Sequence, residues 1–376
     1  MSSAAGARRR AQGTLIPQIG TRRFASHILT QAVMMEGEGG VEGSVAPGGA
    51  APALGALREG THVVDGIRAA YTVADPPEAQ HVANTPPLVL VHGLGGNSAH
   101  FSKNLQQIAA AYGGSVYAVD LIGFGRSAKP LGVDYSEALW AWQIHSLMED
   151  VVRTEQVFLA GNSLGGYLAM LVAATHPAQV AGLCIMNAIA PSGVINPSGL
   201  DVPLFRLPPV ADALAGQALA AASSPKGVRE TLKDLYSDPA ALDENMVSSL
   251  VFTGRAASGR QLFASLFRSQ PGRRWEELLV SDELGLGLYE GPVLALWGER
   301  DTWMPPQVLE PLRERSAGLD VALLPAGHCP HDEAPAAANA RLAAWMREVL
   351  SEGRNRFEIS RVPRYKKLPL SPRYIN

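Results

Sequence analysis

The chain has 376 residues, of which 47% are hydrophobic and 18% are charged, and its formal net charge is −3. This composition is typical of a globular protein and lacks the basic excess expected of a protein that binds nucleic acid. No run of about 18 apolar residues predicts a membrane span. The two cysteines, Cys184 and Cys329, are too few for a disulfide framework, and no Cys and His spacing predicts a zinc site. We therefore expect neither a metal nor a cofactor.

The two ends of the chain have compositions of their own. Residues 1–35 contain five arginines and no acidic residue, which is typical of a transit peptide for a chloroplast or, as the alternative, a mitochondrion. The same composition also fits a disordered basic tail. Residues 36–59 are rich in Gly, Ala and Pro and indicate a flexible linker. Residues 353–376 form a basic tail with three prolines, a candidate for peripheral contact with a membrane surface.

The intervening domain, expected over residues 60–352, alternates strands and helices. A hairpin around Asp65-Gly66 comes first. Largely apolar runs then predict strands over residues 88–91, 116–120, 157–160, 183–186, 293–297 and 321–324. Helical spacing predicts helices over residues 101–111, 136–152, 167–174, 307–314 and 335–350. This alternation predicts an α/β fold, with a mostly parallel central sheet covered by helices on both faces.

The alternation stops between about residues 190 and 291. No buried strand is predicted there, and helical stretches follow one another over residues 211–222, 227–236 and 244–267. We interpret this region as a mainly helical cap inserted into the sheet domain.

Residues 161–165, Gly-Asn-Ser-Leu-Gly, stand between an apolar strand and a helix. Strand, G-x-S-x-G and helix in this order are typical of a nucleophile elbow, in which the turn is too tight for side chains at Gly161 and Gly165. Ser163 then lies at a helix N-terminus, whose unpaired N–H groups stabilise negative charge. The alternative is a glycine-rich turn that holds an incidental serine.

A nucleophilic serine needs a base, and the base needs an acid that orients it. In this architecture the chain order is serine, acid, histidine, and Asp301 and His328 follow two later strands in that order. Both lie at the carboxyl ends of strands, where open α/β sheets place their sites. Glu299 is the alternative acid, and His331 is expected to be a capping or packing residue.

An oxyanion hole requires two fixed N–H donors. We assign them to the backbone of Leu164, directly after the nucleophile, and of Leu94, in the loop after strand 88–91. That loop, His92-Gly93-Leu94-Gly95-Gly96, matches neither a dinucleotide-binding pattern nor a P-loop. His92 is a candidate substrate contact, although bracing of the loop by hydrogen bonds is the alternative.

Three stretches together resemble the α/β-hydrolase superfamily over about residues 60–350. They are residues 161–167 (Gly-Asn-Ser-Leu-Gly-Gly-Tyr), 297–305 (Trp-Gly-Glu-Arg-Asp-Thr-Trp-Met-Pro) and 326–333 (Ala-Gly-His-Cys-Pro-His-Asp-Glu). Within that superfamily the chain resembles the plant and algal plastid hydrolases grouped with pheophytinase. The resemblance implies a Ser-His-Asp hydrolase with a helical cap and a plastid location. Dehalogenases and many epoxide hydrolases of this superfamily use Asp where this chain has Ser163.

We therefore predict a serine esterase whose partner is a small hydrophobic ester, with a phytyl ester as the candidate that the resemblance implies. Apolar residues of the cap and of the loop after Asp301 are candidate walls of the substrate site: Phe205, Leu207, Trp303 and Met304. The same triad also fits acyl transfer, C–C bond hydrolysis or perhydrolysis. A non-catalytic protein that uses the cavity for ligand binding or assembly is the rival of another class.

Overall fold

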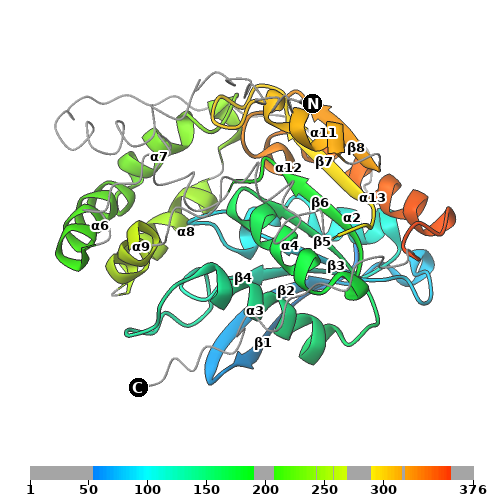
Figure 1. The fold of residues 1–376 in the computed structure, drawn as a ribbon, viewed down its shortest axis with the longest axis horizontal. Helices are drawn as coiled ribbons and strands as arrows, with labels where there is room; N and C mark the ends of the chain where they lie inside the picture. The colour runs from blue at the N-terminus through cyan, green and yellow to red at the C-terminus, as the bar shows by residue number, and fades with distance from the viewer. Residues whose placement is uncertain are drawn as a thin grey trace, which may run out of the picture.

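The computed structural model describes residues 54–189, 207–242, 244–256, 258–268, 289–315 and 318–356. The expected transit peptide, most of the linker, Phe205 and most of the basic tail lie outside these residues. The described chain forms an eight-stranded sheet in the order β1-β2-β4-β3-β5-β6-β7-β8 (Figure 1). Its strands are β1 (Leu57–Val64), β2 (Ile67–Ala74), β3 (Leu88–Val91), β4 (Val116–Asp120), β5 (Val157–Asn162), β6 (Val180–Met186), β7 (Val293–Gly298) and β8 (Leu319–Leu324).

The predicted α/β architecture is confirmed. The hairpin of β1 and β2 is antiparallel, β2 pairs antiparallel with β4, and the remaining neighbours pair in parallel. The strands β3, β5, β6 and β7 are buried along their whole length, which explains why their sequences are continuous apolar runs rather than alternating ones.

Helices cover both faces of the sheet. The main helices of the sheet domain are α2 (Leu105–Tyr112), α3 (Glu137–Leu147), α4 (Leu164–Thr175), α11 (Glu310–Arg315) and α13 (Pro335–Ser351). On one face, α2 and α13 pack in a cluster that includes Ile108 and Trp345. On the other face, α3 and α4 pack in a second cluster that includes Trp140 and Leu168. The short elements are η2 (Glu78–Gln80), η3 (Ser98–Phe101), the π-helix η4 (Met148–Val152), η5 (Pro177–Gln179), η9 (Pro306–Leu309) and α12 (Pro330–Glu333).

Four helices lie in the described part of the interval where the cap was expected, on the left in Figure 1. They are α6 (Pro208–Ala222), α7 (Pro225–Lys233), α8 (Glu244–Arg255) and α9 (Gly259–Arg268), with the short η7 (Pro239–Ala241) between α7 and α8. The stretch predicted as one helix over residues 244–267 is thus two helices, separated by a turn in which Gly259 N donates to Ala256 O at 2.8 Å. Val228 and Val251 belong to a small apolar cluster that also includes Cys329 of the loop after β8.

The first strand begins at Leu57, ahead of the boundary expected at residue 60. Leu57 pairs with Ala74, and the side chain of Arg58 forms an ion pair with Asp75. The early residues of β1 are exposed along the sheet edge, so the strand carries little apolar signal in the sequence.

Candidate active site

The elbow has the strained geometry that its glycines predict. Ser163 has φ 54° and ψ −123°, outside the regions that L-residues favour, and directly precedes α4. A Cβ on Gly161 would lie 2.2 Å from Gly165 O, and a Cβ on Gly165 would lie 2.0 Å from Val91 O. Both glycines are therefore required by contact with backbone. Ser163 N donates to Met186 O at 2.9 Å, which ties the turn to the neighbouring strand.

The loops after β7 and β8 bring the predicted acid and base together. His328 Nδ1 lies 2.7 Å from Asp301 Oδ2, and both side chains are buried. The second carboxylate oxygen of Asp301 accepts hydrogen bonds from the backbone N–H groups of Trp303, at 2.8 Å, and Met304, at 3.0 Å. Burial alone would raise the pKa of Asp301, but the interaction with His328 and the backbone donors outweigh it and lower that pKa below its ordinary value.

The elbow and the histidine loop are in direct contact. Asn162, the residue before the nucleophile, donates through Nδ2 to His328 O at 2.8 Å. No hydrogen bond joins Ser163 Oγ to the His328 ring within the described residues. Such bonds are commonly long without substrate and tighten in the Michaelis complex. The three predicted residues thus gather at one edge of the sheet, with the acid and base already paired.

The loop after β3 approaches the nucleophile closely. A Cβ on Gly93 would lie 3.1 Å from Ser163 Cβ. Gly96 N donates to Gly93 O at 3.1 Å, and Gly95 has φ 79°, so residues 93–96 form a tight turn. Within the described residues, the N–H groups of Leu94 and Leu164 make no backbone hydrogen bond, and they stay the predicted oxyanion donors.

The structure favours the bracing role of His92 over the substrate contact. The ring is fully buried, its Nδ1 lies 2.7 Å from Gly93 O, and its Nε2 accepts from Leu121 N at 3.0 Å. Both nitrogens are therefore occupied within the protein, and burial lowers the pKa of the ring. The buried ring therefore holds the glycine-rich loop in place, and neither of its nitrogens is available to bind substrate.

The residues predicted to line the substrate site differ in how far their side chains are exposed to solvent. Trp303 is partly exposed, and its ring centroid lies 5.8 Å from that of His328, so it offers an apolar surface beside the base. Met304 is buried with the core of the sheet domain, and its carbonyl accepts from Trp297 Nε1 at 2.7 Å. Leu207 is 50% exposed at the start of α6, and Phe205 lies outside the described residues.

The alternatives to the acid and base are placed elsewhere. The side chain of Glu299 is 46% exposed and lies 3.9 Å from Arg300 Nε. His331 is a packing residue, buried with its ring centroid 4.4 Å from that of His100, and burial lowers its pKa well below the ordinary value. Cys329 is a buried free thiol, and burial raises its pKa. Asp301 and His328 are thus the one acid and base pair that the geometry supports among these candidates.

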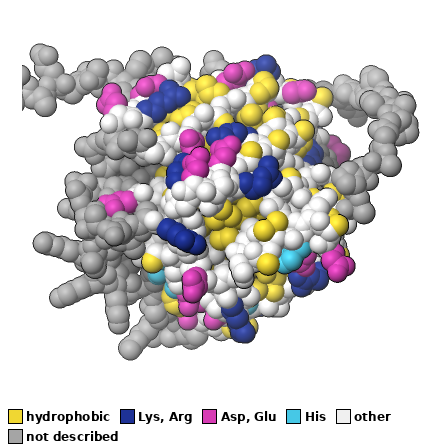
Figure 2. All heavy atoms as spheres, turned by 90° about the vertical axis from the view of Figure 1, so that its right-hand side faces the viewer, with side chains coloured by type: hydrophobic (Ala, Val, Ile, Leu, Met, Phe, Trp, Pro, Cys, Tyr) yellow, Lys and Arg dark blue, Asp and Glu magenta, His cyan; other side chains and the backbone are white. Residues whose placement is uncertain are grey.

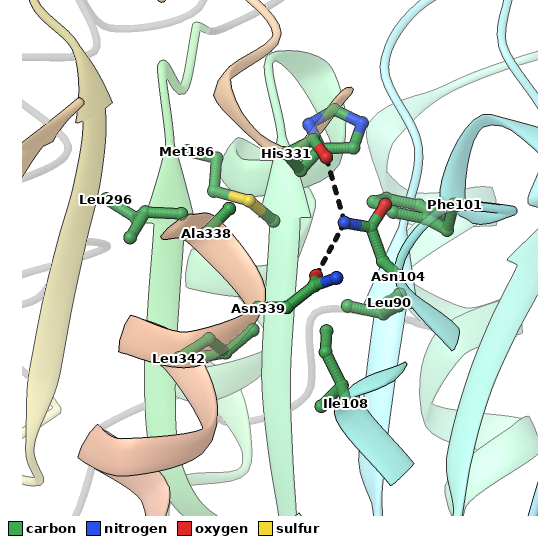
Figure 3. A pocket seen from close by; sticks show the side chains of 10 residues that line it. All are labelled: Leu90, Phe101, Asn104, Ile108, Met186, Leu296, His331, Ala338, Asn339 and Leu342. Carbon is green, nitrogen blue, oxygen red and sulfur yellow. Dashed lines mark hydrogen bonds between the residues drawn. The ribbon is translucent and has the colours of Figure 1, made fainter. Parts of the chain in front are cut away.

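A small cavity lies beneath the histidine loop (Figure 3). Its walls are mainly apolar, with Asn104 at one edge donating to His331 O at 2.8 Å and to Asn339 Oδ1 at 2.7 Å. The cavity has a volume of about 10 Å³, which is enough for a single water molecule. The cavity therefore belongs to the packing under the loop and is too small for a substrate.

Sequence reasoning missed Asn187, the residue that follows β6. Its side chain is fully buried, with Nδ2 donating to Asp301 Oδ2 at 2.6 Å and Oδ1 accepting from Gly298 N at 2.9 Å. Asn187 thereby fixes the carboxylate that orients His328. The one signal in the sequence is its position at the carboxyl end of a buried strand, where a polar residue is worth testing as part of the site.

Three wider features bear on partners. Within the described ranges, no helix is long and apolar enough to cross a membrane, and no group of three or more His, Cys, Asp and Glu side chains is placed to hold a metal ion. Figure 2 shows that basic and acidic side chains are interspersed over the described part of one face of the molecule.

A mostly parallel sheet with a serine elbow, a carboxylate after β7 and a histidine after β8 is typical of a hydrolase of the α/β class. The family model for the alpha/beta hydrolase family matches residues 88–341, and the chain belongs to this family. Chloroplastic pheophytinase of Arabidopsis thaliana is 27% identical over 314 residues, which cover 72% of this chain and 63% of that protein. The match thus spans less than two thirds of the length of that relative.

Two further likenesses differ in the chemistry that their names state. A 2-hydroxymuconate semialdehyde hydrolase of a Pseudomonas species is 27% identical over 247 residues, which cover 65% of this chain and 80% of that protein. The solved structure of a membrane phospholipase A, a bacterial virulence factor, is 25% identical with a TM-score of 0.54 and covers 78% of this chain and 87% of that one. The family therefore establishes a hydrolase fold without fixing the bond that is cleaved.

Proposed function

We propose that the protein is a serine hydrolase that cleaves a carboxylic ester of a bulky hydrophobic substrate, with a phytyl ester as the first candidate. The observation that carries this proposal is the buried pair of Asp301 and His328, 2.7 Å apart, beside a serine in strained elbow geometry. Such strain persists only where the surrounding structure imposes it, and it clusters at functional sites.

In the proposed reaction, Ser163 Oγ attacks the ester carbonyl while His328 Nε2 takes its proton. Asp301 accepts the Nδ1–H of the imidazole and stabilises the imidazolium that forms. The N–H groups of Leu94 and Leu164 bind the oxyanion of the tetrahedral intermediate. The imidazolium then gives its proton to the leaving alcohol, and an acyl-enzyme remains. A water activated by His328 releases the carboxylic acid and restores the serine.

The substrate class rests on two supports. The partly exposed indole of Trp303 beside His328 provides apolar surface for a hydrophobic group close to the bond that is cleaved. Two of the likenesses, a pheophytinase and a membrane phospholipase A, carry names of enzymes that act on lipid-like molecules. We propose a plastid location on the arginine-rich residues 1–35 and the chloroplastic relative, and peripheral membrane contact through the basic residues of the tail.

The test is labelling of the purified full chain with a fluorophosphonate probe, followed by mass spectrometry. We expect one label on Ser163, absent from Ser163→Ala, and protection by pheophytin or by a long-chain p-nitrophenyl ester. Failure of the folded wild-type protein to label would overturn the proposal and favour the rival binding protein.

A second candidate, C–C bond hydrolysis, is favoured by the 27% identical semialdehyde hydrolase. Product analysis separates the two reactions, because ester cleavage yields an alcohol and an acid whereas C–C cleavage of a dienoic ketone yields no alcohol. Added competing alcohols reveal acyl transfer as a new ester product.

A further inference from the structure

The segment that follows α7 in the cap lies directly against the loop that carries the catalytic histidine. Leu235 O accepts a hydrogen bond from His328 N at 2.8 Å. A Cβ on Gly327 would lie 2.5 Å from Leu235 O and 2.8 Å from Ser237 N, so the residue before His328 must be glycine for the segments to approach this closely. The cap and the base therefore meet backbone to backbone.

One carboxylate, that of Glu333, binds both segments. Its Oε2 accepts hydrogen bonds from Ser237 N and Ser237 Oγ, each at 2.7 Å, on the cap side. Its Oε1 accepts from Gly327 N at 2.8 Å and from Cys329 N at 3.3 Å, the two residues that flank His328. Charge-assisted hydrogen bonds of this kind are stronger than neutral ones. Glu333 thus joins the cap to both sides of the base.

A second contact runs beside the first. Tyr236, buried between the two segments, donates through its hydroxyl to Asp332 Oδ2 at 2.7 Å, and Asp332 Oδ1 lies 2.8 Å from Lys103 Nζ. Neighbouring residues of the cap therefore bind neighbouring acids of α12. A displacement of this cap segment would move the backbone that carries His328.

We infer that Ser237 and Glu333 are positioning residues that hold His328 in line with Ser163, so that docking of the cap sets the activity of the base. This inference rests on the proposed hydrolase function. The two residues touch no reacting atom and act through the backbone around His328. Their loss is expected to lower kcat, because alignment of the base is a requirement of the transition state, while KM for a compact ester stays unchanged.

The experiment compares Ser237→Ala with Ser224→Ala in the full chain, with p-nitrophenyl acetate as substrate. Ser237, which follows α7, donates through its Oγ to Glu333 Oε2 at 2.7 Å. Ser224 instead caps the start of the same helix, where its Oγ accepts from Gly227 N at 3.0 Å, away from the histidine loop. We expect Ser237→Ala to lower kcat about tenfold, a typical cost of one lost charge-assisted hydrogen bond, with KM unchanged. Ser224→Ala should keep kcat, and Ser237→Thr, which retains the hydroxyl, should restore it.

Hydrogen–deuterium exchange of the peptide covering residues 325–334 gives a second readout that needs no catalysis. We expect faster exchange at the amides of Gly327 and Cys329 in Ser237→Ala and Glu333→Gln than in the wild type. Equal kcat and equal exchange in Ser237→Ala and Ser224→Ala would overturn the inference. A wild-type protein that neither labels nor hydrolyses would refute the proposed function, and the exchange experiment would still decide whether the cap holds the loop.

Discussion

Replacement of Asn187 tests how the catalytic acid is held. Asn187 is buried, has φ 43°, and makes one hydrogen bond to the charged Asp301 and one to Gly298 N. Asn187→Gly removes both hydrogen bonds and tolerates the backbone conformation. Asn187→Ala removes the same bonds and adds strain, because alanine disfavours a positive φ.

The structure sets the size of the effect. A hydrogen bond to a charged group contributes about 1.5–3 kcal/mol, and the buried Gly298 N–H left without its acceptor costs about 1–3 kcal/mol. We therefore expect Asn187→Gly to lower the free energy of unfolding by roughly 3–5 kcal/mol, and Asn187→Ala to lower it by about 1 kcal/mol more. In the same variants kcat should fall more than KM rises, because the freed carboxylate orients the imidazole less well.

Urea unfolding followed by circular dichroism measures the stability, and steady-state hydrolysis measures kcat and KM. Asn162→Ala is a useful comparison, because Asn162 binds His328 O and Met186 O without touching the acid. If the free energy of unfolding of Asn187→Gly lies within about 1 kcal/mol of the wild-type value and its kcat is unchanged, the reasoning that the Asn187 amide fixes Asp301 is refuted.

Three further predictions concern the elbow and the acid. Ser163→Ala should abolish hydrolysis while leaving the melting temperature near or above that of the wild type, since the smaller side chain keeps the fold; differential scanning fluorimetry and an ester assay check both. Gly165→Ala should give little folded protein, because its Cβ would lie 2.0 Å from Val91 O, and expression with circular dichroism shows the outcome. The pKa of Asp301 is lowered in the fold, so its stabilising effect is complete above the ordinary value of about 3.9 and is lost as pH falls through the lower folded value. The difference in the free energy of unfolding between the wild type and Asp301→Asn should therefore narrow below about pH 4. A difference that is constant with pH would contradict the stabilisation of the Asp301 carboxylate by its hydrogen-bond partners.

Motifs at strand ends account for what the sequence could predict. Ser163 and Asp301 each follow a buried strand, and His328 follows the partly exposed strand β8. Parallel strands bring their carboxyl ends to one edge of the sheet, so residues that follow different strands in the sequence come together in space. The fold could also be predicted, because few architectures bury continuous apolar strands that alternate with amphipathic helices.

The residues that sequence reasoning missed or misplaced depend on contacts between distant segments. Met304 is predicted as a wall because it is apolar and follows the acid, whereas its burial is set by packing with the core cluster of the sheet domain. Asn187 and Glu333 are single polar residues without a spacing pattern, and their roles appear only when β6, β7 and α12 are assembled. Burial and hydrogen-bond partners of this kind are set by tertiary packing, which no local pattern encodes.

The insertion of the cap between β6 and β7 has a consequence for how such proteins diversify. The entropic cost of a connection rises only slowly with its length, by about 0.6 kcal/mol for each doubling, so the strands can carry a long or a short insertion at similar cost. The contacts between the insertion and the sheet domain are confined to particular places: the apolar cluster around Val228 and Val251 includes Cys329 of the histidine loop, and α9 packs through Leu262 and Leu266 in the core of the sheet domain. Away from these contacts, the length and sequence of the insertion can change while the strands that position Ser163, Asp301 and His328 stay the same.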